Sequence, residues 1–171
     1  MKKICLVAFV AILSITSINA QEVKFGVTAG LFNASAKAEF EGISADGSEA
    51  GFYIGGVADI SISEKLHIQP ELVYVSVDGS NGIALPIIAK YYVSDDFNIQ
   101  FGPHLDFTLE DVPTDFTGLG ISLAAGLGYD INENIFIEGR YAFQLNDYYT
   151  GDLDINTTTN SLMIGVGYRF N

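Results

Sequence analysis

The sequence has no tryptophan and one cysteine, and its 8 basic residues face 21 acidic ones. The cysteine, Cys5, lies in the first apolar segment, so the rest of the chain cannot be a disulfide-stabilised scaffold. A formal net charge of −13 disfavours attraction to nucleic acid and to anionic lipid headgroups. Motifs for a phosphate-binding loop, a zinc site or a catalytic nucleophile are missing as well. We therefore expect neither a cofactor nor a metal site.

The N-terminal apolar run, residues 4–13, is too short for a transmembrane helix. Lys2 and Lys3 precede it, and a small, polar stretch after it ends at Ala20. This order is typical of a secretory signal peptide. We expect residues 1–20 to be removed on export, which leaves a mature domain of 21–171 and changes the formal net charge from −13 to −15.

Residues 83–107 show most clearly what the chain does contain. Apolar side chains alternate there with polar or small ones in two runs, which are separated by Ser94, Asp95 and Asp96. A period of two is typical of a β-strand, and about 9 to 11 residues suffice for a tilted strand to cross a bilayer. We interpret the segment as a membrane-spanning β-hairpin.

The same alternation occurs eight times along the chain. Links of three residues alternate with longer ones, expected at 33–50, 109–117 and 147–159, and a short link is expected at 78–82. In transmembrane barrels the short turns face the periplasm and the long loops face outward. The pattern predicts an all-β fold, an eight-stranded antiparallel up-and-down transmembrane β-barrel. The expected strands are 22–32, 51–62, 66–77, 83–93, 97–107, 118–129, 135–146 and 160–170.

A soluble up-and-down barrel would show the same alternation, so the charges on the two faces must decide. The apolar face of the expected strands carries no charged residue, whereas the other face carries four acids and four bases. A soluble barrel needs many charges on its water-facing side, while a membrane barrel turns the apolar face to lipid and the sparse charges to its lumen. We therefore favour the membrane barrel. The charges expected in the lumen are Lys24, Asp59, Glu71, Lys90, Asp106, Glu138, Arg140 and Arg169.

These eight charges are the candidate functional residues. Charges in a narrow lumen must pair, because an unpaired buried charge costs several kcal/mol. Glu138 and Arg140 lie two residues apart on one expected strand, and we expect Arg169 on the next strand to reach them. The network either plugs the barrel or gates a narrow conduit. We favour the plug, since side chains roughly fill the interior of an eight-stranded barrel.

Inward glycines and histidines leave further alternatives. The glycines either leave a hollow or make room for Tyr92, Phe136 and Arg140 to pack across the lumen, and we favour packing. His67 and His104 are both expected to point inward. A lipid-trimming enzyme would need such a group on its lipid-facing surface, so this placement disfavours catalysis.

The longer links are rich in acidic residues, which attract divalent cations such as Ca²⁺ or Mg²⁺. Asp152 and Asp154 form the best-spaced pair of carboxylates. No complete calcium-loop motif is present, so solvated acidic loops are the preferred interpretation.

Six sequence blocks resemble a known family. The chain is similar to the outer-membrane β-barrel domain family, often called PorT-like or porin-like and common in Bacteroidota, and to eight-stranded barrels of the OmpA and OmpX type. The blocks are LHIQPELVY (66–74), LPIIAKYYV (85–93), FNIQFGPHL (97–105), LAAGLGYDI (123–131), FIEGRY (136–141) and GVGYRF (165–170). The resemblance implies a barrel in the cell outer membrane. It also implies insertion by the barrel-assembly machinery, which reads the terminal aromatic residue, here Phe170.

We predict a non-catalytic integral outer-membrane protein with a structural or surface-interaction role through acidic extracellular loops. The alternative is a narrow channel or a small-ligand-binding, porin-like barrel. The expected partners are outer-membrane lipid, including lipopolysaccharide, and the barrel-assembly machinery. We expect a monomer that does not bind nucleic acid.

Overall fold

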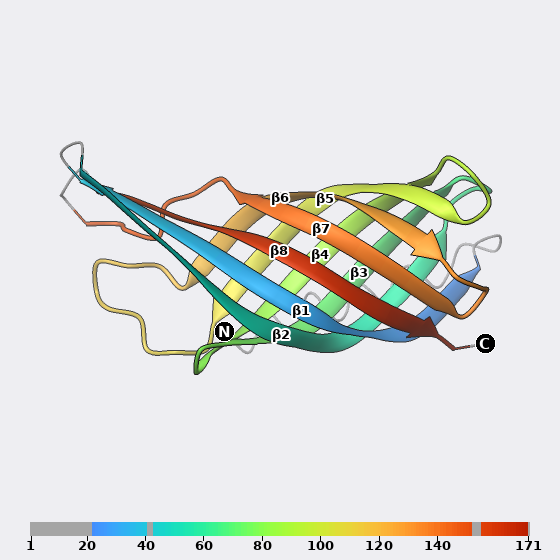
Figure 1. Cartoon of the computed structure of the whole chain (residues 1–171), viewed down its shortest axis with the longest axis horizontal. Helices are drawn as coiled ribbons and strands as arrows, with labels where there is room; N and C mark the ends of the chain where they lie inside the picture. Colours follow the sequence, from blue (N-terminus) through green and yellow to red (C-terminus); the bar gives the residue numbers. More distant parts are fainter. Residues whose placement is uncertain (1–21, 41–42, 152–154, 171) are drawn as a thin grey trace.

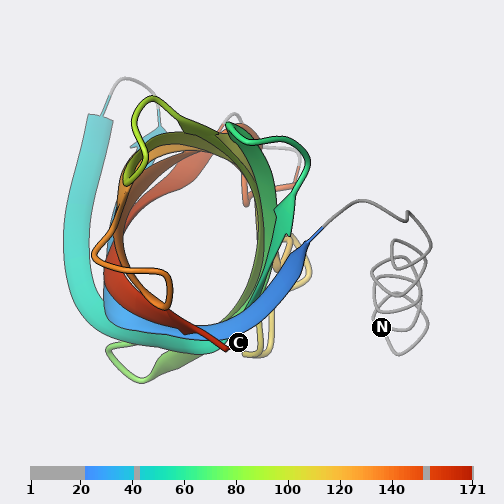
Figure 2. The same cartoon turned by 90° about the vertical axis from the view of Figure 1, so that its right-hand side faces the viewer.

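A computed structural model describes residues 22–40, 43–151 and 155–170 of the chain. Within these residues, eight antiparallel strands form a closed barrel in which β1 pairs with both β2 and β8 (Figures 1 and 2). No helix in the described ranges is long and apolar enough to cross a membrane. The strands are β1 (Val23–Phe40), β2 (Ile43–Ser61), β3 (Leu66–Val77), β4 (Ser80–Tyr92), β5 (Phe97–Thr108), β6 (Leu119–Asp130), β7 (Ile135–Gln144) and β8 (Ile155–Arg169).

The predicted fold class and strand order are confirmed. Three short turns between β2 and β3, β4 and β5, and β6 and β7 lie at the end of the barrel that also holds the C-terminus (Figure 1). The predicted link 78–82 is shorter than expected, because Asp78 and Gly79 alone turn the chain, with φ of 43° and 83°. Positive φ at both positions is what a two-residue hairpin requires, and Asp followed by Gly adopts it readily.

Three strands extend well beyond their predicted bounds. The predicted link 33–50 is almost entirely strand, because β1 continues to Phe40 and β2 begins at Ile43. The strand β8 begins at Ile155 rather than at 160. Together these segments project past the rest of the barrel, at the end opposite the short turns (Figure 1). Residues 45–50 are exposed, so no apolar alternation marked this part as strand.

The two faces of the barrel wall differ as the charge pattern predicted. Large apolar side chains point away from the lumen and are exposed, including Leu31 at 70% and Leu72 at 57%. Inward side chains are occluded, and Val73 and Ile88 have no exposed surface at all. An apolar exterior around a filled interior is the arrangement expected for a barrel whose solvent is lipid.

Prolines interrupt the strand pairing without shifting it. Pairing between β2 and β3 is broken beside Pro70, and pairing between β4 and β5 is broken between Pro86 and Ala89. The register is the same on both sides of each interruption, so no residue is bulged out. These prolines therefore occupy positions at which no ladder donor is needed.

Inward glycines make room for large side chains. This is the alternative that the sequence analysis favoured over an empty lumen. A Cβ atom at Gly165 would lie 2.0 Å from the Tyr53 hydroxyl, and one at Gly167 would lie 2.0 Å from Phe136 Cζ. Tyr53 and Phe136 are each 1% exposed. Phe136 is the direct pairing partner of Gly167 on the neighbouring strand, and Tyr53 reaches Gly165 across β1, so glycines on nearby strands leave space for both rings in the lumen.

An arginine on the exterior should destabilise the barrel. Leu72 lies in the middle of β3 and faces outward, so Leu72→Arg should lower the free energy of unfolding by roughly 2 to 4 kcal/mol in lipid. Urea unfolding in phospholipid vesicles measures the change. As a control, Ser80→Arg at the exposed start of β4 should change stability by less than about 0.5 kcal/mol. Equal effects of both substitutions would contradict the conclusion that the apolar face of the strands points to lipid.

Candidate functional site

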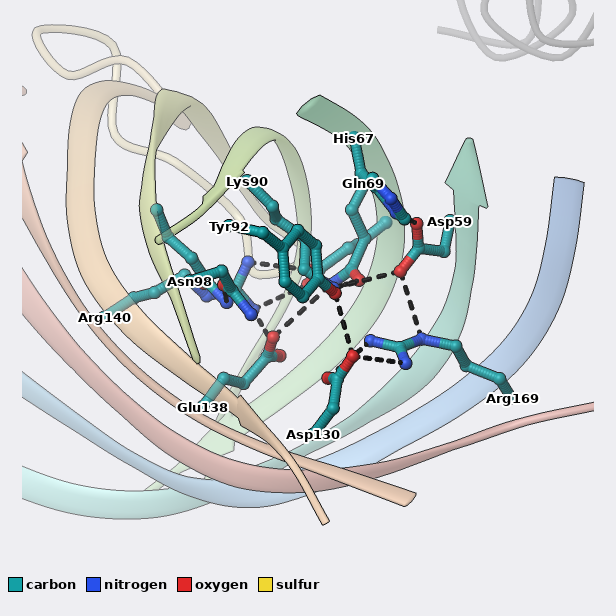
Figure 3. Close-up of polar contacts among 12 residues, drawn as sticks. Asp59, His67, Gln69, Lys90, Tyr92, Asn98, Asp130, Glu138, Arg140 and Arg169 are labelled. Atoms are coloured by element: carbon teal, nitrogen blue, oxygen red, sulfur yellow. Dashed lines mark hydrogen bonds and ion pairs between the residues drawn. The ribbon is translucent and has the colours of Figure 1, made fainter. Parts of the chain in front are cut away.

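A connected polar network fills the half of the lumen nearest the short turns (Figure 3). Six of the eight predicted lumen charges belong to it, and each is at most 5% exposed. They come from five strands, since alternation points one side chain in two inward on each strand. The six are Asp59 on β2, Glu71 on β3, Lys90 on β4, Glu138 and Arg140 on β7, and Arg169 on β8.

Arg140 holds the inner end of the network. Its Nη1 donates to Glu71 Oε1 at 2.6 Å and its Nη2 donates to Glu71 Oε2 at 2.8 Å, which makes a bidentate pair across the barrel. Nη2 also donates to Glu138 Oε1 at 2.9 Å. One guanidinium therefore compensates two buried carboxylates, an arrangement that suits the planar fork of arginine.

Gln69 and Lys90 connect this cluster to the next one. The Gln69 amide nitrogen donates to Glu71 at 2.7 Å and to Glu138 at 3.3 Å, and its oxygen accepts from Lys90 Nζ at 2.9 Å. Lys90 Nζ donates in turn to Asp59 Oδ2 at 3.0 Å. The Gln69 amide thus links the Lys90 ammonium group to the Glu71 and Glu138 carboxylates, with which Lys90 itself makes no hydrogen bond.

Arg169 closes the network at the mouth of the barrel. Its Nη1 and Nη2 donate to the two carboxylate oxygens of Asp130 at 3.0 and 2.9 Å, and its Nε lies 3.0 Å from Asp59 Oδ2. The Tyr92 hydroxyl donates to Asp130 Oδ2 at 2.9 Å. Phe136 lies beneath the guanidinium, with 4.6 Å between the ring centroid and Arg169 Cζ.

The six buried charges balance, three acids against three bases. Each ionised side chain carries a desolvation cost of several kcal/mol, which is offset only if every partner is present. The network therefore fixes which strands lie opposite one another more than it adds net stability. Tyr53 Oη, Asn98 Nδ2 and Gln100 Oε1 are buried and have no protein hydrogen-bond partner among the described residues.

The two other predicted charges lie apart from the network. Lys24 is 33% exposed and pairs with Glu22 at 3.5 Å, at the mouth. Asp106 lies towards the opposite end and pairs with His104 at 3.0 Å. The expected contact of Arg169 with Glu138 and Arg140 is replaced by its ion pairs with Asp59 and Asp130, because the chain register places Arg169 nearer the mouth.

Sequence reasoning missed Asp130, Gln69 and Tyr53. Asp130 lies one residue past the expected strand 118–129 and Gln69 carries no charge, so a count of the charges within the expected strands overlooked both. Alternation did place Gln69 and Tyr53 on the inward face, and that signal could have found them.

An open vestibule of about 970 Å³ lies between the mouth and the network. Its wall is built from the three short turns, and its floor includes His67, Tyr92, Asp130 and Arg169. His67 Nδ1 lies 2.6 Å from Asp59 Oδ1, and the His67 ring packs on Tyr92 with 4.8 Å between centroids. The vestibule therefore ends on side chains that are already bonded to one another.

The outer half of the lumen holds a buried apolar cluster beside the buried polar side chains of His104, Ser122 and Ser161. Its buried cluster includes Phe32, Tyr53, Val75 and Met163. Tyr148, from the link after β7, inserts over Gly120 beside Asp106. Burial, together with the Asp106 carboxylate, raises the pKa of Tyr148 to about 12.

Two of the longer links also pack on each other. The Thr117 nitrogen donates to the Tyr148 carbonyl at 2.8 Å, and the Thr150 nitrogen donates to the Asp115 carbonyl at 2.7 Å. Phe116 and Tyr149 stack edge to face at 5.3 Å. These contacts hold the two links together at the outer end of the barrel.

Groups that could hold a metal ion are not found among the described residues. The suggested carboxylate pair, Asp152 and Asp154, lies outside those residues. Both histidines point inward as predicted, since His104 is 1% exposed and His67 lines the vestibule. Each is bonded to an aspartate of the lumen, and neither lies on the lipid-facing surface.

A closed eight-stranded barrel with an apolar exterior and paired charges inside defines a class, the small transmembrane β-barrels. The sequence adds the family: residues 5–170 match the model of the outer membrane protein beta-barrel domain. The chain belongs to this family, and the protein is located in the outer membrane. The predicted signal peptide, 1–20, lies outside the described residues.

Solved barrels share the fold. Neisserial surface protein A superposes with a TM-score of 0.53 at 18% identity, covering 87% of this chain and 99% of that one. Ail, the attachment invasion locus protein of Yersinia pestis, superposes with a TM-score of 0.50 at 15% identity over the same shares of the two chains. No curated protein matches the chain significantly. At these identities the likeness establishes the fold alone.

Removing the shared guanidinium should be costly. Arg140→Met leaves Glu71 and Glu138 buried without a cation, and should lower the free energy of unfolding by roughly 3 to 5 kcal/mol. Adding Glu71→Gln and Glu138→Gln should restore most of the loss, because no buried charge is then unpaired. Urea unfolding measures both variants.

Lys24→Met is the matched control, since it removes a partly exposed pair. It should change the free energy of unfolding by less than about 1 kcal/mol. A triple variant that stays as unstable as Arg140→Met would show that the guanidinium acts through packing instead of charge.

Proposed function

We propose that this protein is a non-catalytic outer-membrane barrel that stabilises the envelope and presents an acidic surface to partners outside the cell. The observation that carries the proposal is the filled lumen. Polar side chains block the half near the short turns, and an apolar cluster blocks the outer half. If the lumen is filled, only the outer surface and the two ends of the barrel remain available for binding.

The outer end is strongly acidic. Seven carboxylates are exposed there on β2 and on the links, where the medium reaches them. A basic or neutral partner suits this surface, because like charges repel. The seven are Asp46, Glu49, Asp78, Glu110, Asp111, Asp115 and Asp147.

The apolar band on the exterior supports outer-membrane lipid, including lipopolysaccharide, as the immediate surroundings. Insertion requires the barrel-assembly machinery, for which Phe170 at the end of the last strand is the expected signal. We expect a monomer, since the barrel closes on itself and leaves no unpaired edge within the membrane.

A narrow channel or small-ligand barrel is the second candidate function. The vestibule favours it, because about 970 Å³ is ample room for a small molecule. Its floor is formed by paired side chains, so a solute would have to displace Arg169 or Tyr92 to go further. This obstacle makes the channel the weaker proposal.

Conductance separates the two candidates. Refolded protein in planar bilayers should show no steady openings, because side chains occlude the lumen along its length. A double variant, Tyr53→Ala with Phe136→Ala, removes two rings that fill the lumen opposite glycines and should add small, steady openings. Steady conductance by the unaltered protein would favour the channel and overturn the sealed barrel.

Overproduction tests the absence of catalysis. Cells that overproduce the protein should keep the same lipid A and phospholipid species, because neither histidine reaches the lipid-facing surface. Mass spectrometry of extracted lipids is the measurement, with cells that overproduce a His67→Ala, His104→Ala double variant as the matched control. A new deacylated lipid in the first cells alone would show that the protein is an enzyme.

A further inference from the structure

Beyond the barrel, β2, β1 and β8 continue as a three-stranded projecting sheet, made of residues 33–40, 43–50 and 155–160 (Figure 1). The strand β1 lies in the centre, paired on both sides. Pairing of β2 with β3 stops at Gly51, and pairing of β7 with β8 stops at Ser161. The projecting sheet therefore has two edges, one on β2 and one on β8.

The edge on β8 is covered by the link that precedes it. Thr157 donates its backbone N–H to Asp147 Oδ1 at 3.1 Å, and its carbonyl accepts from the Tyr148 nitrogen at 3.0 Å. Thr159 donates its backbone N–H to Gln144 Oε1 at 2.6 Å. These contacts satisfy the outward N–H groups of Thr157 and Thr159 and the carbonyl of Thr157.

The edge on β2 is bare. The Ser61 nitrogen donates to Glu22 and the Ile62 nitrogen donates to Leu66, so odd residues of β2 point their backbone groups to β1 and even residues point theirs away from β1. The register with β1 is unbroken to Ile43, so the same parity holds in the projecting sheet. Asp46 and Ser48 therefore direct their N–H and C=O groups outward, where no described strand or link pairs with them.

The sequence of this edge does little to protect it. Residues 43–50 contain no proline and no lysine, and the unbroken register excludes a bulge. These are the usual devices by which proteins block an exposed edge strand. The exposed side chains of residues 45–50 are small, apart from Asp46 on one face, which is paired with Lys37 of β1, and Glu49 on the other face. The two acids favour an occupant with basic or neutral side chains over a second, equally acidic copy of this chain.

We propose that the free edge of β2, residues 44–50, binds an extended segment of a partner protein as an added strand, with basic or hydroxyl side chains beside Asp46. Main-chain hydrogen bonds supply the affinity in this mode of recognition, and alternate side chains supply the selectivity. The proposal rests on the surface-interaction role above, and names the class of partner and the strand that receives it.

The probe is an eight-residue peptide of alternating threonine and lysine, blocked at both ends. Its control is the same peptide N-methylated at every residue, which keeps the charge but removes the backbone donors on both edges. Hydrogen exchange of refolded protein should show fast-exchanging amides at Asp46 and Ser48. The first peptide should slow them at least tenfold, and the methylated one should not.

Two variants isolate the backbone contact. Ser48→Pro and Ser48→Ala both remove the bond from the Ser48 hydroxyl to Asn33 Oδ1, but only proline removes the outward N–H. Peptide affinity, measured by fluorescence anisotropy, should fall at least tenfold in Ser48→Pro and less than twofold in Ser48→Ala. Equal affinities of the two variants, or equal binding of the methylated peptide, would overturn the proposal.

Two further outcomes are decisive. Slow amide exchange at Asp46 and Ser48 without peptide, or dimerisation that Ser48→Pro abolishes, would mean that the edge is already occupied and would overturn the proposal. Steady conductance would instead count against the sealed barrel while leaving the edge result intact, so the two failures are distinguishable.

Discussion

The structure depends on one electrostatic constraint: a charge inside a sealed barrel must find its counter-charge there. Lipid surrounds the wall, and the lumen is too full for a hydration shell. Arg140, shared by Glu71 and Glu138, and Lys90, bonded to Asp59, meet this constraint by reaching across the lumen to other strands. Their contacts tie β2, β3, β4 and β7 together, and Arg169 adds β8. Since removal of one member leaves another uncompensated, the network also selects one register of the whole barrel.

Space filling works with this constraint. Large inward residues are placed beside glycines of nearby strands, as with Tyr53 over Gly165 and Phe136 over Gly167. Phe136 lies against Arg169 as well, so the ring both fills the lumen and stabilises a charge of the network. The result is a barrel with two different halves: the half near the short turns holds the ionic network, and the outer half holds an apolar cluster beside the His104–Asp106 pair. A conduit would need a continuous wet path, whereas here the vestibule ends on bonded side chains.

The two ends of the molecule differ in a way that bears on function. The end with short turns is compact and holds the vestibule, while the other carries packed links and a projecting sheet (Figure 1). Closure of the barrel removes strand edges inside the membrane, but the extension of β1, β2 and β8 creates new ones in water. One of these is covered by side chains of the chain itself and the other is not. A functional surface is therefore most reasonably sought outside the membrane, on the sheet.

The sequence by itself determined the fold class, the order of strands and the side each residue faces, because alternation in a strand has a period of two and the cost of charge in lipid is large. Six of the eight charges assigned to the lumen meet in one network, yet their partners could not be predicted. Which inward side chain meets which depends on strand tilt and register, and so Arg169 contacts Asp59 and Asp130. The projecting part of β1 and β2 was also missed, because both of its faces meet water and the pattern that reveals a strand disappears. Only the tertiary structure decided where the barrel wall ends, at Gly51 of β2, and where the unpaired edge of that strand begins.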